Sequence, residues 1–250
     1  MVIGGAAAPP AMIRAFREKH GIEVLHAWGM TELSPLGTVN RFKSRHWDLA
    51  EAERAALREK QGRPPFGIDL RIVGAKDAPL PHDGAAFGDL QARGHWVIDR
   101  YFKEGEGSAT RAGWFPTGDV STIDADGFMK ITDRSKDVIK SGGEWISSID
   151  IEGLAMAHPE VAEAAVIGVK HPKWDERPVL VVVRKPGTQV PRESLLGFLE
   201  GKIARWWMPD DVVFVESLPH TATGKLSKVE LRRQLAGYEL PVTTIDSRKP

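Results

Sequence analysis

The sequence predicts an α/β segment at the N-terminus, a β-rich middle and an α+β domain at the C-terminus. Residues 10–20 carry apolar side chains at helical spacing, and an apolar run of strand length follows Gly21. Between residues 62 and 130, short β-rich pieces alternate with Gly, Pro and Asp turns. After Asp133, apolar runs of strand length are interleaved with helical patterns. These three patterns predict more than one domain in 250 residues.

The first segment has the helix-then-strand order of an α/β protein. The Pro9-Pro10 pair favours a helix start, and Gly21 is expected to end that helix. We expect a buried strand over residues 22–25. Residues 48–60 are rich in Ala, Glu, Leu and Arg, so we expect a surface helix there.

The middle segment is expected to form a small β-barrel or an antiparallel sheet. Asp126-Gly127 predicts a hairpin turn between the last two strands of this segment. The four predicted strands cover residues 68–73, 87–92, 119–123 and 128–131.

The C-terminal part predicts a self-sufficient α+β domain. Its predicted strands are residues 164–169, 179–183 and 212–215, and a helix precedes the third strand. Ser227 and Glu230 have the spacing of a capping box for a last helix. Polar residues cluster after Asp133. We therefore expect a first domain over residues 1–133, a second over 134–240 and a loose tail over 241–250.

The composition excludes several classes of function. With 34 Lys and Arg against 34 Asp and Glu, and a pI near 7.1, there is no electrostatic case for a nucleic-acid partner. The chain has no cysteine, so it has no disulfide, thiol nucleophile or thiolate metal site. No apolar run approaches the roughly 20 residues of a transmembrane helix. We expect a cytoplasmic protein that binds small molecules.

Generic motifs are absent or incomplete. There is no Gly-x-Gly-x-x-Gly, so a nicotinamide-type site has no support. Thr223-Gly224-Lys225 resembles the end of a phosphate-binding P-loop. However, Pro219 and Leu226 stand where that loop needs Gly and Ser or Thr. The eight histidines lack metal-ligand spacing.

Four polar segments are not explained by packing alone. Residues 26–32 (His-Ala-Trp-Gly-Met-Thr-Glu) follow an apolar strand, where open α/β sheets bind ligands. Residues 113–119 end in an Asp that suits ribose hydroxyls. A Gly-Gly pair within residues 133–145 permits close approach to a ligand. Residues 219–225 form a hydroxyl-rich loop that ends in a Lys. Taken singly, each also fits a turn, a linker or a surface loop.

Together, the segments resemble the motifs of the adenylate-forming superfamily. This superfamily comprises acyl-CoA synthetases, firefly luciferase and the adenylation domains of peptide synthetases. Residues 4–9 resemble its adenine-facing segment. Residues 28–32 resemble its Tyr-Gly-x-Thr-Glu motif, with Trp28 in place of Tyr. The remaining motifs follow in family order at residues 117–119, 133–137, 140–144 and 219–225.

Within the superfamily, residues 143–148 and 171–178 are most similar to medium- and long-chain fatty acyl-CoA ligases. The family's Ser/Thr/Gly-rich phosphate loop, which ends in Pro-Lys-Gly, does not occur in this sequence. The resemblance therefore implies the C-terminal part of such an enzyme. That part comprises the end of a large AMP-binding domain, with its α/β segment and small β-barrel, followed by a small mobile α+β domain.

The resemblance also implies roles for individual residues. Thr31 would bond phosphate and Glu32 would hold Mg²⁺. Asp119 would accept the ribose hydroxyls, with Arg134 nearby, and Lys225 would bridge the substrate carboxylate and the α-phosphate of ATP. The adenine would be framed by Gly5, Ala6, His26, Ala27 and Trp28.

A second set of implied roles concerns the small domain. Lys136 would be its hinge and contact the nucleotide. Lys140 and Trp145 would face the nucleotide in one state. The pantetheine channel of coenzyme A would be lined by Gly142, Gly143 and Trp174. Residues 206–207, two adjacent tryptophans, fit either a coenzyme contact or the hydrophobic core.

The implied activity is ATP-dependent activation of a fatty acid as its acyl-adenylate, followed by transfer to coenzyme A. The ligands are then ATP or AMP, Mg²⁺, coenzyme A and a fatty acid, and the resemblance is compatible with a homodimer. Two alternatives stay open. The chain can be a non-catalytic nucleotide-binding fragment, or part of an enzyme that adenylates an aryl or amino acid for a carrier protein.

Overall fold

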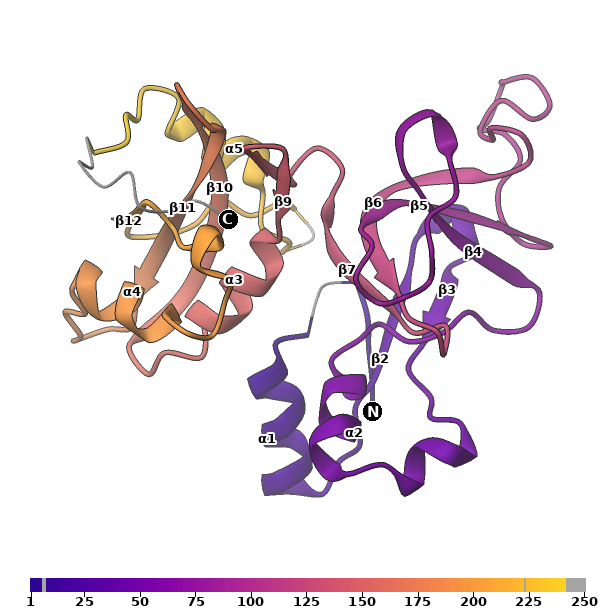
Figure 1. The fold of residues 1–250 in the computed structure, drawn as a ribbon, viewed down its shortest axis with the longest axis horizontal. Helices are drawn as coiled ribbons and strands as arrows, with labels where there is room; N and C mark the ends of the chain where they lie inside the picture. The colour runs from indigo at the N-terminus through magenta and orange to yellow at the C-terminus, as the bar shows by residue number, and fades with distance from the viewer. Residues whose placement is uncertain (6–7, 223, 242–250) are drawn as a thin grey trace. The chain divides into compact units, whose positions relative to one another are not determined.

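The computed structural model describes residues 1–5, 8–222 and 224–241 (Figure 1). Its chain divides into two compact units, Met1–Ser135 (unit 1) and Lys136–Pro250 (unit 2). Most of the predicted tail, residues 242–250, lies outside the described residues. Within the described residues, no helix is long and apolar enough to cross a membrane.

A three-stranded sheet carries the first predicted segment. Strand β1 (Val2–Ile3) pairs parallel with β2 (Leu25–Gly29), and β2 pairs antiparallel with β3 (Leu36–Val39). Helix α1 (Pro10–His20) connects β1 to β2 and ends where Gly21 adopts φ 63°, so the predicted helix is confirmed.

The strand expected over residues 22–25 is displaced, because β2 begins only at Leu25 and continues through polar His26 to Gly29. A polar residue inside a buried strand conceals it from a search for apolar runs. The helix expected over residues 48–60 is also shorter. A 3₁₀ turn, η2 (Ser44–Asp48), precedes α2 (Glu51–Arg58), and the Glu53 carboxylate accepts a hydrogen bond from the Ala50 N–H at 3.0 Å.

The middle segment forms a four-stranded antiparallel sheet, as one of the two expectations had it. Its order is β4-β5-β6-β7, with bounds Ile68–Val73, Gly88–Gly94, Phe115–Ile123 and Met129–Arg134. The sheet is not a closed barrel, because β4 and β7 are not paired among the described strands. Instead, residues 61–63 bridge neighbouring strands. Gly62 pairs with Met129 of β7 and Arg63 pairs with Val39 of β3.

Unit 2 is built on a mixed five-stranded sheet. Strands β10 (Val161–His171) and β11 (Asp175–Arg184) form a long hairpin, and β12 (Asp211–Phe214) pairs parallel with β11. At its first residue, Asp175, β11 also pairs with β8 (Ile139–Ser141), which pairs with β9 (Glu144–Ile146). The short strands β8 and β9 were not predicted from the sequence.

Both faces of the β10–β11 hairpin are buried. Helices α3 (Ser148–Ala155) and α4 (Arg192–Leu199) pack on one face, and α5 (Lys228–Gln234) packs on the other. Alternate residues of β10 and β11 enter the two cores, which explains why these strands read as continuous apolar runs. Trp206 and Trp207, on the 3₁₀ turn η4 (Arg205–Trp207), pack partly buried against the first core.

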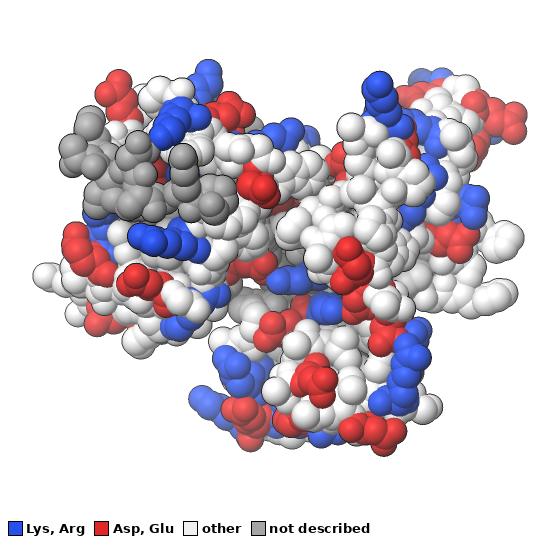
Figure 2. All heavy atoms as spheres, in the orientation of Figure 1, with Lys and Arg blue, Asp and Glu red and all other residues white. Residues whose placement is uncertain are grey.

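The surface carries charges of both signs. Figure 2 shows Lys and Arg side chains interspersed with Asp and Glu on the visible face, in keeping with the balanced composition.

Candidate functional site

The Asp119 carboxylate is the centre of the polar site in unit 1. Asp119 lies on β6 and is 3% exposed. The Trp28 indole Nε1–H, from β2, donates to its Oδ2 at 2.9 Å, and the Arg134 Nε lies 2.9 Å from its Oδ1. Arg134 is the direct cross-strand partner of Asp119 in the β6–β7 pair. Trp28 and Arg134, two residues predicted to contact the nucleotide, therefore both bond the carboxylate of a third, Asp119.

The Trp28 ring occupies a space that Gly37 leaves open. Gly37 lies on β3, and a Cβ atom there would lie 2.3 Å from Cζ3 of Trp28 and 2.9 Å from a methyl group of Leu33. Trp28 itself is 8% exposed and belongs to the core of unit 1. The structure thus gives Trp28 an enclosed position with its polar edge on Asp119.

The predicted adenine-framing residues lie around the β1–β2 edge. His26 is 1% exposed, and its Nε2 accepts a hydrogen bond from the Ala8 N–H at 3.3 Å. Ala27 is buried beside it on β2. Gly5 is exposed with φ 86°, and a Cβ there would meet nothing within 4 Å. Ala6 lies outside the described residues.

Thr31 and Glu32 lie on the 3₁₀ turn η1 (Thr31–Leu33), directly after β2. The Tyr101 hydroxyl donates to Oε1 of Glu32 at 3.1 Å, and the Ile98 N–H donates to the Glu32 carbonyl oxygen at 2.8 Å. Burial and the bond to the Glu32 carboxylate raise the pKa of Tyr101. Tyr101 thus bonds the carboxylate that the family resemblance assigned to Mg²⁺, and Ile98 bonds the backbone of the same residue.

No cluster of three or more His, Cys, Asp or Glu side chains suited to a metal occurs in the part of the chain that the structure describes. A single carboxylate still suits Mg²⁺, which retains water and binds through one or two carboxylates together with substrate phosphates.

In unit 2, Gly142 and Gly143 form the two-residue turn of the β8–β9 hairpin. Both have positive φ, 60° and 90°, a conformation that favours Gly in such turns. Lys140 and Trp145 are directly opposite each other across this hairpin. The hairpin therefore brings four of the residues predicted for ligand contacts within one short segment.

Trp174 packs against this turn. The Gly142 N–H donates to the Trp174 carbonyl oxygen at 2.9 Å, and a Cβ on Gly142 would lie 2.8 Å from Cε3 of the Trp174 ring. The Lys173 ammonium lies 4.9 Å from the centre of the same ring. The three residues predicted to line the coenzyme channel are therefore adjacent.

Arg177 is a buried residue that the sequence analysis did not single out. It is 5% exposed, and its guanidinium donates five hydrogen bonds. Two go to Oδ1 of Asp210, one to Oγ of Ser141, and one each to the carbonyl oxygens of Trp206 and Met208. Arg177 therefore connects Ser141, the residue before Gly142, to η4. A lone Arg after an acidic pair gives no sequence signal for this role.

Lys225 lies at an exposed turn before α5. The Thr221 N–H donates to the Lys225 carbonyl oxygen at 2.7 Å, and the Ser227 N–H donates to the Pro219 carbonyl oxygen at 2.8 Å. Ser227 also accepts from the Glu230 N–H at 3.4 Å, which provides one half of the predicted capping box. The loop is therefore closed by its own backbone hydrogen bonds, and Lys225 is exposed on it.

A buried ion pair lies at the base of this loop. The Lys228 ammonium is 2.7 Å from Oε1 of Glu152 on α3 and also bonds Oγ of Ser148. The same Glu152 oxygen accepts the Val166 N–H of β10 at 2.8 Å. This network ties α5, and the loop before it, to α3 and the sheet.

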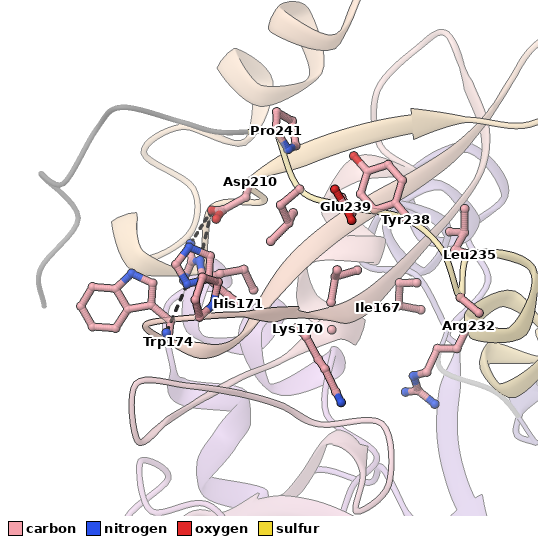
Figure 3. Close-up of a pocket in the computed structure, with 16 residues that line it drawn as sticks. Ile167, Lys170, His171, Trp174, Asp210, Arg232, Leu235, Tyr238, Glu239 and Pro241 are labelled. Carbon is pink, nitrogen blue, oxygen red and sulfur yellow. Dashed lines mark hydrogen bonds and ion pairs between the residues drawn. The ribbon is translucent and has the colours of Figure 1, made fainter.

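A pocket of about 740 Å³ lies within unit 2. One side comes from β10 and the turn that follows it, and the other from the segment after α5 (Figure 3). Ile167, Leu235 and Tyr238 line it, and Trp174 lies at one end. Arg177 also lines the pocket. This pocket was not predicted from the sequence.

Two family models match the chain. The AMP-binding enzyme model matches residues 1–102, and the AMP-binding enzyme C-terminal domain model matches residues 150–225. The chain belongs to the AMP-binding, adenylate-forming enzyme family.

Proteins similar in sequence to this chain include acyl-CoA ligases. The chain is 58% identical over 231 residues to a 3-methylmercaptopropionyl-CoA ligase of Ruegeria lacuscaerulensis, covering 92% of the chain and 43% of the relative. It is 52% identical to a medium-chain-fatty-acid–CoA ligase of Ectopseudomonas oleovorans, covering 94% of the chain and 43% of the relative. The chain thus spans less than half the length of these relatives.

A solved structure gives the same family. ATP-bound MatB from Rhodopseudomonas palustris superposes with a TM-score of 0.79 at 31% identity, covering 94% of the chain and 45% of that protein. The mixed α/β architecture inferred from the motifs is therefore that of adenylate-forming enzymes.

Proposed function

We propose that this chain is part of an ATP-dependent fatty acyl-CoA ligase. In the first step, the fatty-acid carboxylate oxygen attacks the α-phosphorus of ATP, and the bond to pyrophosphate breaks. In the second, the deprotonated thiol of coenzyme A attacks the acyl carbon, and AMP leaves. The observation that carries the proposal is the meeting of Trp28, Asp119 and Arg134, which builds a buried acceptor suited to ribose hydroxyls.

Lys225 is proposed to act in the first step. Negative charge develops on the α-phosphate oxygens as the carboxylate attacks, and a nearby ammonium stabilises that charge. An exposed Lys on a locally closed loop suits this role, because its charge is not consumed within a buried network.

Glu32 is proposed to hold Mg²⁺ and Thr31 to bond a phosphate oxygen. The ion would supply positive charge to the triphosphate when bound. Glu32 is already oriented by Tyr101, so this side chain needs little rearrangement to present an oxygen.

Gly142, Gly143 and Trp174 are proposed to line the channel for the pantetheine arm. A Cβ on Gly143 would meet nothing within 4 Å, so the backbone at this turn is open to a thin flexible chain, while the Trp174 ring covers it at Gly142. Lys136, the first residue of unit 2, is proposed as the hinge between the two steps. Lys140 and Trp145 are proposed to face the nucleotide in one of the two states.

The acid is proposed to be a medium- or long-chain fatty acid, supported by the 52% identity to a medium-chain ligase. A second candidate is a short thioether acid, supported by the 58% identity to a 3-methylmercaptopropionyl-CoA ligase.

The test is AMP release by the purified 250-residue chain with ATP, Mg²⁺, coenzyme A and a panel of acids. The panel contains fatty acids of several lengths and 3-methylmercaptopropionate. Release that requires both an acid and coenzyme A supports the proposal, and the fastest acid identifies the substrate. Release with a carrier protein but not with coenzyme A would contradict it. Acid-independent ATP hydrolysis would contradict it as well.

A further inference from the structure

The Trp28–Asp119 hydrogen bond is built from two strands of different sheets. Trp28 lies on β2 and Asp119 on β6, and the bond from Nε1–H to Oδ2 measures 2.9 Å. The indole cannot turn away easily, because its six-membered ring fills the space above Gly37 and beside Leu33. A donor held by packing in this way fixes the orientation of its acceptor.

The second carboxylate oxygen of Asp119 has a donor of its own. Arg134 lies 2.9 Å from Oδ1 and comes from the neighbouring strand β7. The Asp119 side chain is only 4% exposed, whereas Arg134 is 54% exposed. The enclosed indole is thus the more rigid of the two donors, and the guanidinium can adjust to it.

We propose that Trp28 is the positioning residue for ribose recognition, and that it acts through its indole N–H on Asp119. This inference rests on the proposed nucleotide site. The ring is 8% exposed, so little of its surface is available for stacking on a base. Its effect on a nucleotide is therefore expected at the ribose end, with AMP or ATP as the ligand class.

The chemistry of the ribose explains why orientation matters. Its 2′ and 3′ hydroxyls are adjacent, and a carboxylate can accept from both only when its plane faces the pair. A carboxylate held from two sides is already in one plane, so binding does not have to restrict its rotation. A carboxylate that can rotate would bind a ribose that lacks one hydroxyl nearly as tightly as an intact ribose.

The experiment compares AMP with 2′-deoxyAMP and 3′-deoxyAMP by isothermal titration calorimetry on the 250-residue chain. The unaltered chain is expected to bind AMP about tenfold more tightly than either deoxy form, since one net hydrogen bond corresponds to about that factor. Trp28→Phe keeps an aromatic ring but has no N–H. It is expected to weaken AMP binding about tenfold and to remove most of the preference for the intact ribose.

The matched control is Trp47→Phe. Trp47 lies in the same unit and is 53% exposed, so the same substitution there is expected to leave both affinities unchanged. Loss of AMP affinity in Trp28→Phe with the preference for ribose intact would overturn the inference and would instead favour stacking on the base.

A second measurement covers the outcome that Trp28→Phe fails to fold. The Trp28 indole N–H resonance of the unaltered chain is expected to exchange slowly with solvent, and to shift and exchange faster in Asp119→Ala. An indole resonance that does not respond to Asp119→Ala overturns the inference. Absence of AMP binding by the unaltered chain would instead overturn the proposed nucleotide site, even with the indole bond intact.

Discussion

Asp119 in unit 1 and Arg177 in unit 2 are both buried charges, but they are used differently. Asp119 is held by donors from two other strands and is itself the proposed ligand contact. Arg177 donates five hydrogen bonds, the full number of its N–H groups, to other parts of unit 2. The reactive charge proposed for unit 2, on Lys225, is separate and exposed.

The difference indicates how each unit divides stability from chemistry. In unit 1 the same carboxylate serves both, so a substitution at Asp119 is expected to alter binding and packing together. In unit 2 the two tasks fall on different residues. Substitutions at Arg177 and Lys225 should therefore have separable effects.

The largest expected effect is that of Arg177→Met on stability. Removing the guanidinium takes two hydrogen bonds from the carboxylate of Asp210, whose side chain is 16% exposed, and one each from the carbonyl oxygens of Trp206 and Met208. Breaking one side of a buried ion pair typically costs about 3–5 kcal/mol. Urea unfolding followed by tryptophan fluorescence measures this loss. Arg233→Met, at a 78% exposed side chain on α5, is the control and should change little.

An unfolding midpoint for Arg177→Met within error of the unaltered chain would show that the Arg177 network does not stabilise unit 2. The structural role that distinguishes Arg177 from Asp119 would then be wrong.

The next effect is that of Lys225→Ala on catalysis. Loss of a charge that stabilises the transition state typically costs about 100- to 1,000-fold in rate. We expect that loss in the adenylation step, measured as ATP–pyrophosphate exchange. Thioester formation from supplied acyl-adenylate and the melting temperature should be unchanged, because the Lys225 side chain is exposed.

Lys202→Ala, at another exposed Lys of unit 2, is the control for Lys225→Ala. Equal loss in both half-reactions would contradict the role proposed for Lys225. A large drop in melting temperature would contradict the separation of chemistry from stability.

The sequence predicts elements that depend on local patterns and misses features that depend on distant partners. Helix α1 and strand β4 follow from local patterns, and the structure has both where they were expected. Strand β2 was displaced because His26 interrupts its apolar pattern while lying buried in the strand. Local composition cannot show that a polar residue is enclosed when its partner, the Ala8 N–H, lies 18 residues away.

The candidate site shows the same limit. The motif residues were found by their order along the chain, but not the bonds between them. Trp28 and Asp119 are 91 residues apart, so only the fold shows that the indole donates to the carboxylate. Gly37 gave no signal either, because its role is to leave space for Trp28. Arg177 was missed because its partners, Ser141 and residues 206–210, lie 29 to 36 residues away in the sequence.

A smaller effect is expected at His46, a buried residue of unit 1 that the proposed function does not use. Its Nδ1 accepts the Lys43 N–H at 3.1 Å, and its Nε2 lies 3.1 Å from Asp126 Oδ2. Burial is the main cause that lowers the pKa of His46 from 6.5, and the charges of Arg45, Lys43 and Arg63 lower it further.

The sign of the pH dependence follows from that shift. As pH falls through about 6.5, the unfolded chain binds a proton at His46 before the folded chain does. Stability is therefore complete above pH 6.5 and is lost progressively below it, toward the lower pKa of the folded state. His46→Gln should cost about 1–2 kcal/mol at pH 8 but flatten the dependence on pH between 7 and 5. Exposed His82→Gln is the control, and an equally steep dependence in His46→Gln would contradict the assignment.

The smallest effect is expected for Glu51→Gln, at an exposed cluster that contrasts with both buried charges. Glu51 bonds Arg17 of α1 and also pairs with Arg54 and Arg58, each at 2.9 Å. The hydrogen bond from Arg17 is the main cause that lowers the pKa of Glu51 to about 2. The carboxylate therefore contributes stability above pH 4.5, and that contribution is lost as pH falls toward 2. Because the side chains of Glu51 and Arg17 are 47% and 43% exposed, Glu51→Gln should lower the melting temperature by no more than about 1–2 °C at pH 7. The difference in melting temperature should shrink further in 1 M salt, because the Debye length there is only about 3 Å. A salt-independent loss comparable to that of Arg177→Met would show that exposure does not separate the two kinds of charge.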